Sequence, residues 1–430
     1  MARPLRFCFL SIFYPPYSFG GDAIYLYRLS NALASRGHEV DVIHCLDSYR
    51  MMGGRESKQQ FSNHPNVSVH SLQSRLGFLS PVLAQQFGTT WPKTDRILEV
   101  LYSKKFDVIH YHNVSLLGPQ VLKLEPDYSD FIKLYTTHEH WLVCPMHVLW
   151  KNNERLCEKP ECLRCTLKFK RPPQWWRYTH LLDECVRSID TFIAPTRFTQ
   201  QMHHERGFGP RMTVVPHFVP EQEKPSTENS PHPRPYFLFV GRLEKIKGID
   251  TLLPTFAQYP HADLLIAGTG TYEAELKRQL KGVTNVRLLG SLAQEELRNL
   301  YRHAIALLVP SVCYETLGMI VVESYVQRTP VIARKQGGLT EIVEQSRGGL
   351  LYHSSEELLA AMEKLRTNRM LRDEMGELGY QVFQQKWSES AHLEAYFKVL
   401  EDTARRKLGL VPWHVPSRRS LQLSVVQNAS

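Results

Sequence analysis

The sequence predicts an α/β protein with two Rossmann-like, doubly wound domains that face each other across a cleft. Short apolar runs alternate with amphipathic, helix-like stretches twice along the chain, a pattern that favours parallel sheets covered by helices. Residues 221–235 interrupt this alternation with Pro, Ser, Glu and Lys, as an interdomain linker does. The length of 430 residues also exceeds what one hydrophobic core usually holds.

The predicted first domain spans residues 1–220. Its opening strand at residues 7–13 is followed by a helix near residues 23–36, which Gly37 ends. Apolar runs between turn residues predict the remaining strands of this sheet, at residues 40–44, 106–110, 132–136, 191–194 and 212–215.

The predicted second domain spans residues 236–385. Its first strand covers residues 236–240, and its alternating pattern runs to about Tyr352. Helical periodicity follows at residues 355–367 and 370–384. A last amphipathic helix is expected within residues 386–408, and residues 409–430 form a tail without clear structure.

The bulk composition is that of an ordinary water-soluble enzyme with an excess of basic residues. The formal net charge is +9 and the pI about 9.0, which suits phosphorylated ligands and anionic lipid surfaces. Nucleic acid is not an expected partner, because no nucleic-acid-binding module is recognisable. The first 13 residues read as a strand rather than a signal peptide. We therefore expect a cytoplasmic protein, with peripheral contact at the inner face of the membrane left open.

Two glutamates, Glu315 and Glu323, enclose the most informative segment. An apolar strand leads into it and Gly318 opens a helix within it, so Glu315 stands at the carboxyl end of a strand, where such sheets bind ligands. Glu323 lies in apolar surroundings and needs a hydrogen-bonding partner there. Vicinal sugar hydroxyls suit a carboxylate, and the free amides near Leu317 and Gly318 suit a phosphate. The alternative is a solvated loop acid and a helix acid paired with a nearby lysine.

A second motif follows the strand at residues 236–240. Gly241 permits a tight turn, and Arg242 and Lys247 follow on the loop before a helix expected at Gly248. A guanidinium and an ammonium beside a helix start can neutralise a diphosphate. The alternative is a pair of solvated surface cations.

Together these motifs resemble the GT-B glycosyltransferases of family 4, which are retaining enzymes that use nucleotide-activated sugars. The resemblance rests on Gly241-Arg242, Lys247-Gly248, the segment 265–270 and the two glutamates with seven residues between them, and extends over about residues 5–400. It implies that Arg242 and Lys247 hold the donor diphosphate, that Glu315 lies near the donor sugar, and that Glu323 binds the ribose. It also implies that the last helix returns to the first domain.

The first half resembles the same family at two points. Gly20 and Gly21 match a glycine pair whose backbone closes over the donor phosphates and the acceptor. His138 matches a histidine that touches the donor sugar near the reacting carbon, although Glu139 stands where aspartate is more usual. His110, His112 and His140 lie nearby and compete for this role.

Four of the eight cysteines, Cys144, Cys157, Cys162 and Cys165, fall within 22 residues. Their spacing, which includes a Cys-x-x-Cys pair, allows a tetrahedral structural zinc site that pins an insertion at residues 144–165. The alternatives are four reduced thiols or one labile disulfide. No metal is expected in the chemistry itself, because Arg242, Lys247 and helix amides supply the positive charge.

Two further segments of the first half stand out: residues 168–178 mix cations with aromatic side chains, and residues 76–83 are apolar and flanked by polar sequence. They could dock on an anionic membrane and receive a lipid-linked acceptor. Equally, Trp175 and Trp176 could be core residues or could stack on carbohydrate.

The sequence thus predicts transfer of a sugar from a UDP-, GDP- or ADP-sugar to a hydroxyl of a carbohydrate or lipid-linked acceptor, in polysaccharide, glycolipid or cell-envelope biosynthesis. The resemblance implies retention of anomeric configuration, with no settled protein nucleophile and with the leaving diphosphate assisting deprotonation of the acceptor. Alternatives are a related epimerase or phosphorylase, or a non-catalytic carbohydrate-binding protein.

Overall fold

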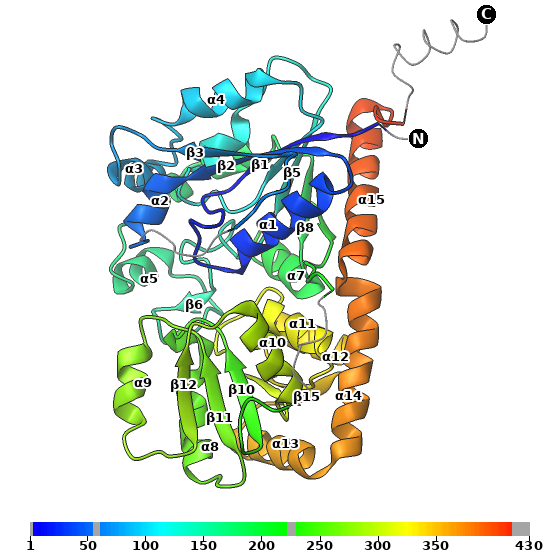
Figure 1. The fold of residues 1–430 in the computed structure, drawn as a ribbon. Coiled ribbons are helices and arrows are strands. Elements are labelled where there is room, and N and C mark those ends of the chain that lie inside the picture. Colours follow the sequence, from blue (N-terminus) through cyan, green and yellow to red (C-terminus); the bar gives the residue numbers. More distant parts are fainter. Residues whose placement is uncertain (1–2, 55–60, 222–228, 415–430) are drawn as a thin grey trace, which may run out of the picture.

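The computed structural model describes residues 3–54, 61–221 and 229–414. Two parallel sheets with flanking helices form an upper and a lower domain, and the C-terminal helices run along one side of both (Figure 1). The doubly wound α/β fold expected from the sequence is confirmed. Among the described helices, none combines the length and the apolar character that crossing a membrane requires.

The first sheet has seven strands in the order β3-β2-β1-β4-β5-β8-β9. The second sheet has six, in the order β12-β11-β10-β13-β14-β15. The strands of the first are β1 (Arg6–Leu10), β2 (Glu39–Cys45), β3 (Val67–Leu72), β4 (Val108–Tyr111), β5 (Ile132–Thr136), β8 (Thr191–Ala194) and β9 (Met212–Val214). Those of the second are β10 (Tyr236–Val240), β11 (Asp263–Ala267), β12 (Val286–Gly290), β13 (Leu307–Val309), β14 (Val331–Arg334) and β15 (Gly349–Tyr352).

The helices cover the two faces of each sheet. In the first domain they are α1 (Gly21–Ala34), α2 (Leu46–Met51), α3 (Leu79–Phe87), α4 (Thr94–Ser103), α5 (Cys162–Lys168), α6 (Leu181–Val186) and α7 (Arg197–Glu205), with 3₁₀ turns η1 (Pro119–Lys123) and η2 (Trp175–Tyr178). In the second they are η3 (Lys245–Lys247), η4 (Ile249–Leu252), α8 (Leu253–Ala257), α9 (Glu273–Gln279), α10 (Gln294–His303), α11 (Met319–Val326), α12 (Gly337–Ser346), α13 (Ser355–Thr367), α14 (Arg369–Val382) and the π turn η5 (Phe383–Trp387), before α15 (Glu389–Leu408).

Each sheet reverses its strand order once, between β1 and β4 in the first domain and between β10 and β13 in the second. Helices that follow the strands on either side of a reversal lie on opposite faces of the sheet, so the loops at the strand ends separate and leave a crevice for ligand. The loops after these four strands carry Gly20, His112, Lys247 and Glu315. The topology therefore brings the sequence motifs to the edges where such sheets bind ligands.

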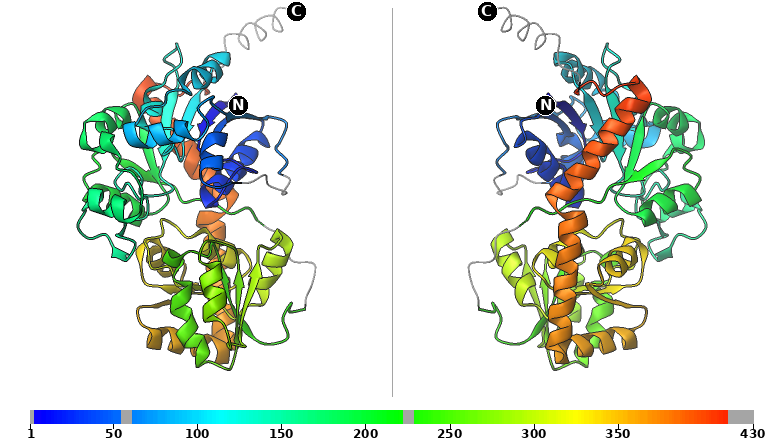
Figure 2. Two further views of the ribbon diagram at one scale, coloured as in Figure 1. Left: turned by 90° about the vertical axis from the view of Figure 1, so that its left-hand side faces the viewer. Right: turned by 90° about the vertical axis from the view of Figure 1, so that its right-hand side faces the viewer.

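The chain crosses between the domains a second time near its end. Phe383 and Trp387 are buried in the core of the second domain, whereas Leu393 and Leu400 of α15 are buried in the core of the first. Figure 2 shows α14 and α15 running past both domains on one side. This crossing fixes the domains to each other at the side opposite α3 and α5.

A small insertion between β5 and α6, residues 141–171, is called the cysteine lobe below. It contains the two-residue strands β6 (Trp150–Lys151) and β7 (Arg155–Leu156), which pair as an antiparallel hairpin, and then α5. Its own buried core is limited to Cys144, Met146, Leu149 and Cys165. Tyr314 of the second domain packs against this cluster, so the lobe lies beside the gap between the domains.

Candidate active site

Lys247 and Glu315 form the centre of the site. Lys247 ends the 3₁₀ turn η3 after β10, and Glu315 lies on the loop between β13 and α11. The Lys247 Nζ donates to Glu315 Oε1 at 2.7 Å, and Ser311 Oγ donates to the same oxygen at 2.7 Å. Because β10 and β13 flank the strand-order reversal, two residues 68 positions apart meet in the crevice.

The surroundings keep both groups of this pair charged. Burial alone would lower the pKa of Lys247, but the Glu315 carboxylate outweighs it and raises that pKa above its usual value. Burial alone would raise the pKa of Glu315, but the Lys247 ammonium and the Ser311 hydroxyl hold that pKa below its usual value. The site therefore presents a fixed ammonium on the loop at the carboxyl end of β10, as binding a phosphate requires.

Arg242, the second predicted diphosphate ligand, lies on the same loop but is more exposed. Its side chain is 54% exposed, and its Nη1 donates to Glu244 Oε1 at 2.8 Å. The Arg242 guanidinium forms no hydrogen bond with Lys247 or Glu315. A ligand phosphate would have to draw Arg242 away from Glu244, which an exposed ion pair of small net stability permits.

A helical segment begins directly after Gly248, as the sequence predicts, but it opens as a 3₁₀ turn rather than as an α-helix. Gly248 adopts the left-handed region with φ +70°, and two 3₁₀ turns, η3 and η4, flank it before the five-residue α8. A Cβ on Gly248 would lie 2.1 Å from the Pro310 carbonyl oxygen. The loop after β10 is thus pressed against the loop after β13, and this tertiary contact sets its conformation.

The anion site predicted from the sequence falls at the start of α11. Gly318 caps this helix in the left-handed region with φ +82°, and Leu317 before it is buried. Across the domain gap, Gly21 opens α1, and the atom nearest to a Cβ built on it is Met319 Cγ at 3.9 Å. The Gly20-Gly21 loop of the first domain therefore faces the amino end of α11 in the second domain. Both elements are predicted to contact the donor phosphates, which requires them to lie close together.

Glu323 contacts the first domain. Its Oε1 accepts from Arg28 Nη2 of α1 at 3.3 Å, and its Oε2 accepts from Tyr301 OH at 3.4 Å. Arg28 is 11% exposed and Glu323 is 21% exposed. The Glu323 carboxylate therefore has a guanidinium partner across the domain gap. The sequence provided no signal for Arg28 in this role, because 295 positions separate the two residues.

His138 lies in the middle of a row of three imidazoles. Its Nε2 is 2.9 Å from His112 Nδ1, and its Nδ1 is 3.0 Å from His217 Nε2. His112 Nε2 and His217 Nδ1 are buried without hydrogen-bond partners. With all three rings neutral, each of the two hydrogen bonds takes one proton, so both nitrogens of His138 are engaged in either tautomeric arrangement. The row holds the His138 ring in place.

Other histidines predicted to compete with His138 have structural partners. His110 bonds Tyr396 OH at 2.9 Å and Thr136 Oγ1 at 2.8 Å, which ties α15 to the first sheet. His140 packs against His203 with ring centroids 5.3 Å apart and tilted ring planes, and both of its ring nitrogens are buried without a hydrogen-bond partner. Glu139 Oε1 lies 2.7 Å from Nδ1 of His147, which belongs to the cysteine lobe.

The buried histidines should make stability depend on acid pH. Burial lowers the pKa of His138, His203 and His392 to about 4 each, below the value near 6.5 of an unfolded chain. Below pH 6.5 the unfolded chain binds more protons at these histidines than the folded protein does. The contribution of the neutral, buried histidines to stability is therefore complete above pH 6.5 and is lost as pH falls towards 4. The free energy of unfolding should fall by up to about 1.4 kcal/mol per pH unit for each site.

Urea unfolding followed by tryptophan fluorescence at pH 7.5, 6.0 and 5.0 measures this slope. The variant His203→Gln should show a smaller slope than the wild type, because one buried titrating ring is gone. The control His180→Gln, at a side chain that is 94% exposed, should leave the slope unchanged. A wild-type free energy of unfolding that stays constant between pH 7.5 and 5.0 would contradict the prediction.

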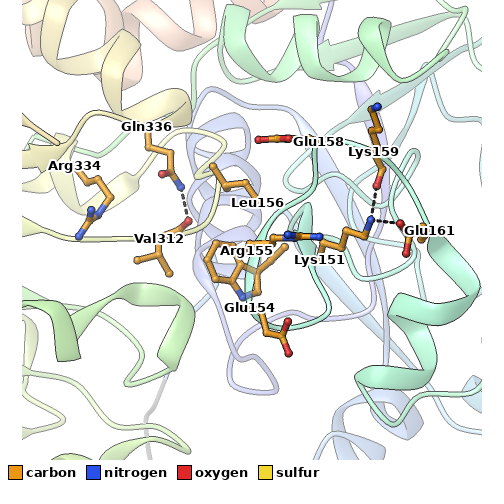
Figure 3. A pocket seen from close by; sticks show the side chains of 11 residues that line it. Lys151, Glu154, Arg155, Leu156, Glu158, Lys159, Glu161, Val312, Arg334 and Gln336 are labelled. Atoms are coloured by element: carbon orange, nitrogen blue, oxygen red, sulfur yellow. Dashed lines mark hydrogen bonds and ion pairs between the residues drawn. The ribbon is translucent and has the colours of Figure 1, made fainter. Parts of the chain in front are cut away.

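A cavity of about 590 Å³ opens between the cysteine lobe and the second domain (Figure 3). The hairpin side contributes Trp150, Lys151 and Arg155, and the second domain contributes Val312, Arg334 and Gln336. Val312 is three residues from Glu315 in the chain, but neither Lys247 nor Glu315 lines the cavity. Lys151 is held there by Glu161 Oε1 at 2.6 Å.

The four clustered cysteines carry free thiols, and two of them, Cys144 and Cys165, are buried. Burial raises the pKa of Cys144 to about 11, and Cys165 Sγ accepts the Asn152 N–H at 3.2 Å. Within residues 3–54, 61–221 and 229–414, no three Cys, His, Asp or Glu side chains are arranged to hold a metal ion. The thiol positions do not fit zinc in this arrangement, and zinc remains a prediction that metal analysis of the purified protein would test.

Contacts missed from the sequence hold the two domains together beside the site. The Thr316 carbonyl accepts from Thr196 Oγ1 at 2.7 Å, and Thr316 Oγ1 donates to the His138 carbonyl at 3.0 Å. Glu341 of α12 accepts the first amides of α7, from Arg197 at 3.1 Å and Phe198 at 2.8 Å. The loop that carries Glu315 is thus attached directly to the strand end that carries His138.

Comparison with known families agrees with this geometry. The family described as "Glycosyltransferase Family 4" matches residues 19–223, and the family "Glycosyl transferases group 1" matches residues 220–382. Together these matches span most of the chain. The chain belongs to the family 4, group 1 glycosyltransferases. The resemblance noted in the sequence is confirmed, and the GT-B architecture with it.

Two curated relatives match this glycosyltransferase over different shares of the chain. An uncharacterized glycosyltransferase of Methanocaldococcus jannaschii is 26% identical over 367 residues, covering 78% of this chain and 82% of its own. A D-inositol 3-phosphate glycosyltransferase of Corynebacterium jeikeium is 33% identical over 180 residues, covering 38% of this chain and 42% of its own.

Solved structures share the fold at low identity. Sucrose-phosphate synthase of Thermosynechococcus elongatus superposes with a TM-score of 0.70 at 21% identity, covering 92% of this chain and 98% of its own. HepE of Anabaena, solved with UDP-glucose, gives a TM-score of 0.66 at 16% identity, covering 93% of this chain and all of its own.

Proposed function

We propose that this glycosyltransferase moves a sugar from a nucleotide-diphosphate sugar to a hydroxyl acceptor with retention of anomeric configuration. The Lys247–Glu315 pair carries the proposal, because it places a charged ammonium and a carboxylate at the carboxyl ends of β10 and β13 beside the amino end of α11. The HepE complexes with UDP and UDP-glucose support a donor of this class.

In the proposed mechanism the residues position the donor and stabilise the leaving group. Lys247, Arg242 and the amides near Leu317 and Gly318 balance charge that develops on the departing diphosphate. Gly20 and Gly21 allow the backbone of the first domain to close over the same phosphates. Glu315 holds hydroxyls of the donor sugar, and His138, fixed between His112 and His217, lines the first-domain side of the reacting carbon. The diphosphate itself assists deprotonation of the acceptor hydroxyl, and the chemistry requires no cofactor.

The acceptor would enter from the side of the cysteine lobe. The cavity there combines cations such as Arg155 with acids such as Glu154 and an aromatic side chain, Trp150. Mixed charge and an aromatic face suit a hydroxylated acceptor such as a carbohydrate. We therefore propose acceptor recognition mainly on the first domain and donor recognition mainly on the second, in a step of polysaccharide, glycolipid or cell-envelope biosynthesis.

Thermal-shift measurements against UDP-, GDP- and ADP-sugars would identify the donor. With that donor and a panel of hydroxyl acceptors, NMR of the product would report the anomeric configuration. A product of inverted configuration would overturn the retaining mechanism. The absence of any stabilisation by nucleotide sugars would overturn the donor assignment.

Glu323→Gln tests the predicted ribose contact. Two hydrogen bonds from vicinal hydroxyls to a carboxylate are stronger than those to an amide. We expect the wild type to bind the preferred nucleoside diphosphate at least about tenfold more tightly than its 2′,3′-dideoxy analogue. The Glu323→Gln variant should lose most of this preference in calorimetric titrations, whereas Glu341→Gln should retain it. Equal discrimination by Glu323→Gln and the wild type would exclude the ribose role.

A further inference from the structure

Two segments of the first domain lack acidic residues altogether. They comprise residues 71–94 and 162–182, which are 24 and 21 residues long. Acidic residues make up 43 of the 430 residues of the chain, so four or five would be expected in segments of this combined length. Each segment contains cations, among them Arg75 in the first and Lys168 and Lys170 in the second. Within their bounds both segments therefore carry only positive charge, although Asp95 flanks the first segment and Glu161 and Asp183 flank the second.

The same two segments expose large apolar side chains. Exposed fractions lie between 43% and 64% for Phe78, Leu79, Phe87, Trp91, Leu163, Leu167, Trp175 and Tyr178. These are eight of the fourteen large hydrophobic side chains exposed among the described residues, although the segments form only about a tenth of the chain. Such a concentration marks an interaction surface rather than the scattered exposure of an ordinary protein.

The two segments are contiguous in space. Trp176 Nε1 donates to the Gln85 carbonyl of α3 at 2.8 Å. A Cβ on Gly88, at the end of α3, would lie 2.8 Å from Leu181 Cδ2 and 3.0 Å from Trp176 Cγ. The turn η2 thus packs against the end of α3, and α3 and α5 lie on the same side of the molecule (Figure 1). We call this surface the α3–α5 face.

Helix α5 presents its apolar residues outward. Leu163 and Leu167 are one turn apart and exposed, and Arg164 and Lys168 form a parallel basic row beside them. These four residues line a shallow hollow. Buried Cys165 and Thr166 hold the opposite side of the helix in the cysteine lobe. The arrangement is that of an interfacial helix, with leucines to insert and cations to remain at the polar surface.

The basic side chains of the α3–α5 face are available to a partner. Lys168, Lys170 and Arg171 are exposed, and within the described residues none of them forms an ion pair. Arg164 has a single loose contact, with Glu161 at 3.9 Å. Arg177 is committed elsewhere, since its guanidinium lies 4.5 Å from the Trp176 ring centre and donates to the Trp141 carbonyl.

We propose that the α3–α5 face docks on an anionic phospholipid surface. Exposed Trp and Tyr side chains favour the water–lipid interface, exposed Leu and Phe side chains gain by inserting into it, and unpaired cations gain from anionic headgroups. The absence of acids within both segments reduces the repulsion that an anionic surface would otherwise meet. The cysteine lobe, which carries α5, also walls the cavity next to the site, so docking would hold the cavity near the bilayer. If the proposed function holds, this favours a lipid-carried acceptor.

Vesicle sedimentation tests the docking without requiring catalysis. The full-length protein is mixed at low salt with vesicles of phosphatidylcholine alone, or of phosphatidylcholine with 30% phosphatidylglycerol as a roughly physiological anionic fraction. We expect binding to the anionic vesicles at least about tenfold tighter than to the neutral ones, and weakening as salt rises. Lys168→Glu with Lys170→Glu should reduce binding about 25-fold or more, on the scale of about fivefold for each cation lost.

A second variant removes the exposed leucines of α5 and keeps the basic residues of the α3–α5 face. Leu163→Gln with Leu167→Gln should reduce binding to anionic vesicles by about tenfold or more, because insertion is lost. The matched controls are Lys281→Glu with Lys398→Glu, and Leu359→Gln with Met370→Gln, which change exposed residues elsewhere. Both controls should bind like the wild type, and melting temperatures should show that all variants are folded.

Three results would overturn the proposal. One is a wild-type protein that does not sediment with anionic vesicles at low salt. Another is binding that the α3–α5 variants and the control variants reduce equally. The third is self-association that the α3–α5 variants abolish while vesicle binding is absent, which would make the face a contact between copies. Because nucleotide-sugar binding is measured separately, failure of docking leaves the proposed function untouched.

Discussion

Replacing Lys247 with alanine should lower turnover by roughly 30- to 1000-fold, equal to about 2–4 kcal/mol of transition-state stabilisation. The ammonium is held by Glu315 at 2.7 Å in a setting that is only 23% exposed, so its charge is weakly screened where the diphosphate is proposed to leave. Water entering the gap would replace this charge poorly, because its dipoles are not fixed in advance.

The neighbouring Lys245→Ala is the matched control. Lys245 lies on the same 3₁₀ turn and is exposed, so its loss should change turnover by less than about twofold. Arg242→Ala should show a loss similar to that of Lys247→Ala. Initial rates with saturating donor and acceptor, together with melting temperatures, separate a catalytic loss from unfolding. Turnover close to that of the wild type in Lys247→Ala would refute the role of this residue.

The fold was largely predictable because its strands are short apolar runs between turn residues. Strands β5, β8 and β10 occupy the residues expected from the sequence, and all three are buried throughout. Helix α13 of the second half also begins and ends as predicted, since Ser354 caps it through its hydroxyl. Local pattern and capping chemistry suffice for such elements.

The partners within the site were less predictable. The motif residues could be assigned singly, but the sequence does not reveal that Lys247 bonds Glu315 or that Arg28 reaches Glu323. These contacts depend on how two sheets and two domains are placed, which no local periodicity records. The loop at Gly248 shows the same limit, since the sequence does not reveal its contact with Pro310 or that the expected helix opens as a 3₁₀ turn.

Gly268→Ala should abolish measurable donor binding, a loss of at least about 100-fold in affinity. Gly268 has φ +140°, a conformation that side chains rarely adopt, and a Cβ there would lie 1.9 Å from the Gly241 carbonyl oxygen. Strain in such a region costs about 1–3 kcal/mol, and the steric clash adds to it. Relief requires the Gly241 backbone to move, which displaces the loop that carries Arg242 and Lys247.

Gly282→Ala is the control that separates the cost of backbone strain from the cost of a steric clash. Gly282 also has a positive φ, +84°, but a Cβ on it meets no atom within 4 Å. Its replacement should therefore cost only about 1–2 kcal/mol of stability, and nucleotide affinity should remain that of the wild type. Calorimetric titration with the preferred nucleoside diphosphate and thermal unfolding of both variants measure the two effects. If Gly268→Ala bound nucleotide as tightly as Gly282→Ala does, the loop after β10 could not be the element that grips the diphosphate.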